Sequence, residues 1–88
     1  MFKTEETRLK RIPVFELMEG WKSNRPDRDK VMLTHKNTGV KFNIWLDRLQ
    51  DIFFVKSSTN DKIIKFDNEK DLEQFVFKMM CLVDNYVL

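Results

Sequence analysis

Residues 30–45, KVMLTHKNTGVKFNIW, decide the fold that we predict for this chain. Apolar and polar side chains alternate in both arms of the stretch, and Asn-Thr-Gly lies between the arms, which is typical of a β-hairpin. The alternation gives each arm one apolar face: Val31, Leu33 and His35 in the first, and Val40, Phe42, Ile44 and Leu46 in the second. We expect these faces to match, with His35 opposite Phe42 and Leu33 opposite Ile44.

Trp45 is out of phase with this apolar face. The register that we predict places Met32 opposite Trp45 and Lys36 opposite Lys41, all on the outer face. Asn43 and Thr34 share that face, and a third strand adds either Phe54 with Ile52 or Phe53 with Val55.

Residues 43–54 also fit an amphipathic helix. Apolar residues recur there at helical spacing, Asn43 is a suitable N-cap, and Trp45 would then belong to the core. We prefer strand, turn and strand, because β-rich stretches lie on both sides and DRLQD can serve as the connection.

The rest of the chain completes an α+β pattern. We predict a strand in residues 12–22, a polar loop in 23–29 (SNRPDRD) and a second hairpin in 51–66 with STND as its loop. A helix follows, capped by Asp67 or Asn68. Its apolar stripe is Leu72, Phe75, Val76, Met79, Leu82, Val83 and Tyr86. The prediction is one domain over residues 1–88: an antiparallel meander of four to five strands packed on one long C-terminal helix, with residues 1–12 loosely ordered.

Composition narrows the class of protein. The 88 residues are 42% hydrophobic and 34% charged, which is globular, and no apolar run is long enough to span a membrane. The first residues have no apolar signal region, and Cys81 is the only cysteine, so we expect a cytoplasmic protein. The net charge of +2 is uneven, with a basic front half and an acidic C-terminal helix.

We expect no catalysis and no cofactor. One histidine and one cysteine do not make a metal site with ordinary ligand spacing, and the chain has no glycine-rich phosphate loop. His35 falls on the inward strand face near a turn, where a structural role is favoured over that of a general base.

Three surfaces are candidates for binding. An exposed aromatic face marks an interaction site, and we expect a partner protein to contact Trp45, Met32, Lys41, Trp21 and Asn43. The alternative ligand is RNA or single-stranded nucleic acid, held by Lys22, Arg25, Arg28, Lys30 and Lys36. Phe77, Met80 and Cys81 widen the apolar stripe of the helix, which predicts either a helix wedged in the core on two sides or a homodimer through this flank.

The chain resembles the small early proteins of T4-like bacteriophages. It has their length, no alanine and many Lys, Asn, Phe and Met residues. THKNTGVKFNI and FVFKMM resemble the double-wing domain of the phage middle-transcription activator over about half of the chain. The resemblance implies a host-takeover or counter-defence protein that binds and inhibits or modulates a host protein without catalysis.

Overall fold

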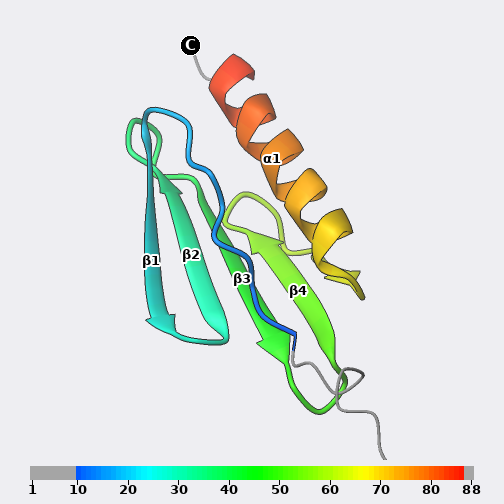
Figure 1. The fold of residues 1–88 in the computed structure, drawn as a ribbon. Coiled ribbons are helices and arrows are strands. Elements are labelled where there is room, and N and C mark those ends of the chain that lie inside the picture. The colour runs from blue at the N-terminus through cyan, green and yellow to red at the C-terminus, as the bar shows by residue number, and fades with distance from the viewer. Residues whose placement is uncertain (1–9, 87–88) are drawn as a thin grey trace, which may run out of the picture.

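The computed structural model describes residues 10–86 of the chain and places five antiparallel strands before one helix. The strands are β1 (Trp21–Asp27), β2 (Lys30–His35), β3 (Lys41–Asp47), β4 (Ile52–Ser57) and β5 (Ile63–Phe66), and they pair in that order. The helix α1 spans Glu69–Tyr86 and lies against one face of the sheet (Figure 1). The α+β meander predicted from the sequence is therefore confirmed, and residues 43–54 form strands and a turn, not a helix.

The faces of the central hairpin are as predicted, but its partners are shifted by two residues. Leu33 lies opposite Phe42, and Lys30, not Met32, lies opposite Trp45. The loop contains four residues, 36–39, and the His35 amide donates to the Val40 carbonyl at 2.8 Å. Gly39 has a φ of 77°, which glycine adopts without strain. A shift of two keeps every side chain on its face, so the predicted Lys36–Lys41 pair is wrong while the apolar match survives.

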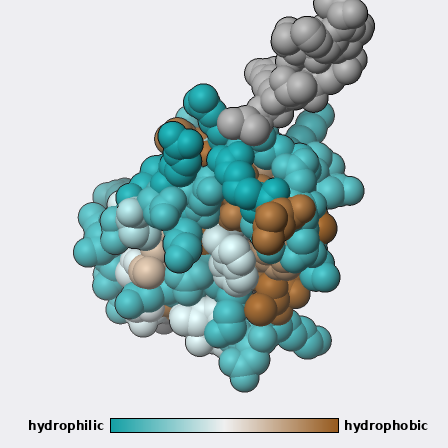
Figure 2. All heavy atoms as spheres, turned by 90° about the horizontal axis from the view of Figure 1, so that it is seen from below, coloured by the Kyte–Doolittle hydropathy of each residue, from teal (hydrophilic) through white to brown (hydrophobic). Residues whose placement is uncertain are grey.

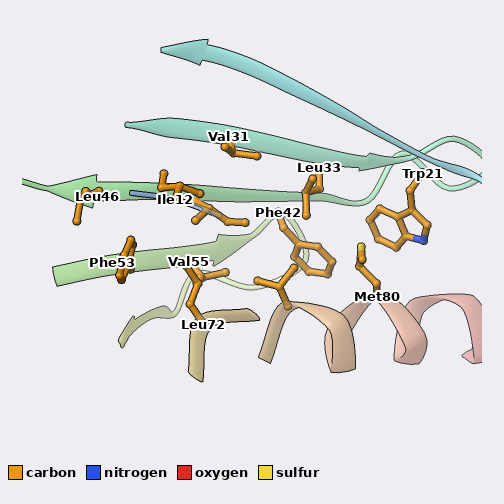
Figure 3. Packing of buried hydrophobic residues seen from close by; sticks show 12 residues of the cluster. Ile12, Trp21, Val31, Leu33, Phe42, Leu46, Phe53, Val55, Leu72 and Met80 are labelled. Atoms are coloured by element: carbon orange, nitrogen blue, oxygen red, sulfur yellow. The ribbon is translucent and has the colours of Figure 1, made fainter. Parts of the chain in front are cut away.

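The core lies between the sheet and α1 (Figure 3). Leu33, Phe42 and Phe53 project from the strands toward Leu72 and Met80 of the helix (Figure 3). Ile44 and Val76 belong to the same buried cluster. Met80, which the sequence placed on an excess flank of the helix, is 1% exposed, whereas Leu82, predicted for the buried stripe, is 38% exposed. The side chain of Tyr86 lies outside the described part of the structure.

The first strand begins later than predicted. Residues 12–18 form no strand, and β1 instead takes up most of the stretch predicted as a polar loop. Within this segment Ile12 is 4% exposed and Phe15 and Leu17 pack against the core, whereas Val14 is 84% exposed. The segment is extended, but it crosses the inner face of the sheet beside α1 rather than pairing with an edge strand (Figure 1).

β1 tolerates turn-forming residues because it is an edge strand. All of its residues after Trp21 are exposed, so polar side chains lose no hydration there. Pro26 sits where the β1–β2 register is interrupted, between Asn24 and Asp27, and a proline needs no ladder hydrogen bond at such a point.

Two contacts hold the N-terminal segment in place. The Lys10 ammonium donates to the carbonyls of Asp51 and Asp67, both at 2.7 Å, and so joins the β3–β4 turn to the start of α1. The Arg25 guanidinium donates to the Pro13 carbonyl at 2.6 Å. These bonds tie residues 10–13 to the sheet and to the start of α1. Residues 1–9 of the segment predicted to be loosely ordered lie outside the described chain, so this expectation stays a prediction.

Candidate functional site

The outer face of the sheet, on the side away from α1, carries the candidate site. Strand pairing sets three cross-strand rows on it: Lys22–Thr34–Lys41, Asn24–Met32–Asn43–Lys56–Ile63 and Lys30–Trp45–Phe54–Lys65. The segment of residues 10–18 packs on the inner face, so it leaves the outer face uncovered. We call these three rows the lysine–aromatic face.

An aromatic pair lies at the centre of this face. The rings of Trp45 and Phe54 stack with centroids 5.4 Å apart and an interplanar angle of 17°. The Lys65 ammonium is 6.0 Å from the Phe54 centroid, a cation–π distance. Phe54 is only 9% exposed, so it supports the indole ring from one side and leaves Trp45 as the accessible aromatic group.

A groove runs beside Trp45. It has a volume of about 430 Å³ and is lined by Pro26, Lys30, Val31, Met32, Asn43, Ile44, Trp45 and Lys56. Ligand sites in proteins commonly enclose about 300–1,000 Å³, so the groove has room for one planar ring system. Met32 and Asn43 lie directly opposite each other across its floor.

The charge on the face is mostly positive. Lys22, Lys30, Lys41, Lys56 and Lys65 contribute five ammonium groups from three rows. Two acids lie at the edge of this face. Asp27 is opposite Lys30 at the end of β1, and Asp47 lies at the end of β3 and accepts hydrogen bonds from its own turn. Hydrogen bonds from the Gln50 side chain and from the amides of Gln50 and Leu49 hold the pKa of Asp47 below its usual value. The Asp47 carboxylate therefore stays ionised, and the face keeps a net positive charge because its five lysines outnumber the two acids.

Of the residues predicted to contact a partner, three line the groove and two do not. Trp45, Met32 and Asn43 are together in it. Lys41 is on the same face but opposite Thr34, one row away. Trp21 is a correction: it is 4% exposed and belongs to the core on the other face, where it stacks on Phe42 at 5.6 Å.

The five basic residues predicted to hold nucleic acid lie in different parts of the molecule. Lys22 and Lys30 point to the lysine–aromatic face, and Lys36 lies in the exposed β2–β3 loop at the far end of the sheet. Arg25 turns toward the N-terminal segment, and Arg28 lies in the β1–β2 turn. The cluster in sequence is therefore not one cluster in space.

Sequence reasoning missed Pro26, Lys56 and Lys65, and it left the face of Phe54 undecided. The missing signal was the length of the β3–β4 turn. With four residues in the turn, Asp47 pairs with Ile52, which places Phe54 beside Trp45 and Lys56 beside Asn43. Counting the residues of this turn would have assigned Phe54 and Lys56 to the outer face.

His35 is itself buried and takes part in a partly buried polar network instead of a surface site. Its Nε2 is 3.0 Å from the Asp84 carboxylate, and its Nδ1 shares a 2.8 Å hydrogen bond with the Thr38 hydroxyl. The Trp21 indole donates to the same carboxylate oxygen at 3.2 Å. The Thr38 oxygen also accepts the Val40 amide at 3.2 Å, as in a side-chain turn motif, so the hydroxyl organises its own loop. We assign this network to the joining of the sheet and helix.

No protein-family model matches the chain, and no curated protein or solved structure matches it significantly. Among residues 10–86, no helix is long and apolar enough to cross a membrane. The interpretation of the site therefore rests on its own residues.

Proposed function

We propose that this protein is a non-catalytic binding protein that holds single-stranded nucleic acid on the lysine–aromatic face. The observation that carries the proposal is the row Lys30–Trp45–Phe54–Lys65, in which an aromatic pair lies between two lysines. Unpaired bases stack on aromatic rings, and lysines neutralise the phosphates between successive bases. The groove beside Trp45 supplies the space for one base, and Asn43 in its floor offers an amide to the base edge.

The test is the affinity for a labelled single-stranded oligonucleotide, measured by fluorescence anisotropy. Base–aromatic stacking contributes about 1–3 kcal/mol, so Trp45→Leu is expected to weaken binding by roughly tenfold or more. Phe77→Leu is the matched control, since Phe77 is 55% exposed on α1, away from this face. Near-ultraviolet circular dichroism checks that both variants keep their fold.

Salt dependence provides a second measurement on the same complex. For single-stranded nucleic acid, a plot of log affinity against log salt concentration has a slope of about −0.7 for each phosphate that the protein neutralises. Lys56→Gln and Lys65→Gln each remove one such charge, so each variant is expected to make the slope less steep by about 0.7. The proposal would be contradicted if the affinity for the oligonucleotide did not depend on salt concentration, or if Trp45→Leu left it unchanged.

A second candidate function is the binding and modulation of a host protein with an acidic surface. It is favoured by Met32 and Trp45 in one groove, because methionine and tryptophan are enriched in protein interfaces. Capture from a bacterial lysate with and without ribonuclease separates the two. A discrete protein that survives nuclease treatment, and that Trp45→Leu no longer retains, would favour this candidate over nucleic acid.

The kinship with small early phage proteins, the location in the host cytoplasm and a homodimer through α1 stay predictions. For the dimer, the relevant observation is that Phe77 and Leu82 remain exposed on the helix.

A further inference from the structure

A second hollow lies at the end of the sheet that carries the β1–β2 and β3–β4 turns. It has a volume of about 380 Å³ and is lined by Arg11, Ile12, Val14, Arg25, Arg28 and Arg48. Figure 2 looks onto this end of the molecule, which is mostly hydrophilic with a hydrophobic group to one side. The fold thus brings together four arginines from the N-terminal segment, β1 and two separate turns.

Two of these guanidinium groups are held in fixed positions by other bonds. Arg48 makes a two-pronged contact with Asp29, with Nη2 2.7 Å from Oδ1 and Nε 3.0 Å from Oδ2. Arg25 donates through Nη2 to the carbonyls of Ile12 and Pro13, at 3.2 and 2.6 Å. Carbonyl groups are neutral, so the contact orients Arg25 without cancelling its charge.

The acids of this region leave a net positive charge in the hollow. The hydrogen bond from Arg48 lowers the pKa of Asp29 and raises that of Arg48, so both stay ionised and neutralise each other. Asp27 accepts the Asp29 amide at 2.9 Å and belongs to the turn itself. Arg11 and Arg28 are exposed, and no bond to either is seen among residues 10–86.

We infer that this arginine hollow is a binding site for a phosphate dianion, either inorganic phosphate or a terminal phosphomonoester. The planar guanidinium fork matches the oxygens of a phosphate and donates to two of them at once. Because several arginines surround one small hollow, the site matches the two negative charges of a phosphate dianion better than the single negative charge of a phosphodiester. The site is formed by different residues from the lysine–aromatic face and does not depend on the function proposed for it.

The test is isothermal titration calorimetry of the full chain, in a phosphate-free buffer of low ionic strength, with inorganic phosphate, adenosine monophosphate and adenosine. Saturable binding of the first two, and none of adenosine, is expected. Tighter binding of the mononucleotide than of inorganic phosphate identifies a phosphomonoester as the natural source, and equal binding identifies free phosphate.

Arg28→Gln and Arg11→Gln are the informative variants, because Arg25 and Arg48 also hold the fold. A charge-assisted hydrogen bond lost from the site is expected to weaken phosphate binding by about tenfold in each. Lys36→Gln is the matched control: it removes one positive charge from an exposed loop at the opposite end of the sheet.

Two results would overturn the inference. One is the absence of saturable phosphate binding by the wild-type protein. The other is an equal loss in Lys36→Gln, which would show diffuse attraction in place of a site. Trp45→Leu is expected to leave phosphate binding unchanged, so failure of the oligonucleotide proposal and failure of this one give different results.

Discussion

Asp84 illustrates how a single residue can work against its own helix and still be favourable. It lies near the end of α1, where the helix dipole opposes a negative charge. Its carboxylate oxygen accepts the Trp21 indole at 3.2 Å and is 3.0 Å from His35 Nε2. Trp21 and His35 are both buried, and a buried donor without an acceptor is costly in free energy. This cost outweighs the unfavourable interaction of the Asp84 carboxylate with the helix dipole.

We expect Asp84→Ala to lower the free energy of unfolding by about 1–3 kcal/mol, because it leaves buried donors unsatisfied. Asp84→Asn keeps an acceptor oxygen and is the matched control, with an expected loss of less than about 1 kcal/mol. Urea denaturation followed by Trp fluorescence measures both. Equal stability of Asp84→Ala and the wild-type protein would mean that water replaces the carboxylate.

At the scale of one element, α1 shows a start that is encoded locally. Asn68 accepts the Asp71 amide through Oδ1 at 2.8 Å, and its Nδ2 donates to the Asp71 carboxylate at 3.0 Å. Glu69 and Asp71 add negative charge to the first turn, where the dipole favours it. Asn68, of the two caps predicted, is the residue that caps the helix.

Removal of this cap is expected to cost about 0.5–2 kcal/mol of unfolding free energy in Asn68→Ala. Gln74→Ala, at an exposed position of the same helix, is expected to change stability by less than about 0.5 kcal/mol. Thermal unfolding monitored by far-ultraviolet circular dichroism reports on both. A cap variant as stable as the Gln74 variant would contradict the assignment of Asn68.

The strands show what alternation alone can resolve. β3 alternates buried and half-buried residues, so its faces follow from the sequence. β4 has three consecutive buried residues, Phe53, Phe54 and Val55, and both of its faces are apolar. Its orientation depends on the turn that precedes it, because a change of one residue would exchange the two faces.

On the scale of the whole molecule, the N-terminal segment and α1 together cover one face of the sheet. Ile12 is in the core cluster, and Phe15, Leu17 and Met18 pack against it. A small domain buries little apolar surface, and here residues outside the strands and the helix complete the hydrophobic core.

We expect Ile12→Ala to reduce the free energy of unfolding by about 2–4 kcal/mol, as for other large-to-small changes in a core. Val14→Ala, two residues away and 84% exposed, is the control and is expected to cost less than about 0.5 kcal/mol. Chemical denaturation measures the free energy of unfolding of the two variants. Similar stabilities would show that the segment contributes nothing to the core.

The sequence by itself determined the central hairpin, the C-terminal helix and the faces of β2 and β3. Period-two alternation in residues 30–45 was enough to place Trp45, Met32 and Asn43 on the outer face, and the cap and apolar stripe were enough to locate α1. These features follow from interactions between residues close in the chain, which local periodicity and turn chemistry record directly.

Only the tertiary structure decided which residues meet across the chain. It buried Trp21 against Phe42, laid residues 10–18 over the core, shifted the central hairpin by two residues and gathered four arginines at one end. The residues of SNRPD favour a turn locally, and pairing with β2 nevertheless holds them in an exposed edge strand. The free energy that chooses between them comes from burial and pairing with distant segments, and that information does not lie in any one stretch of the sequence.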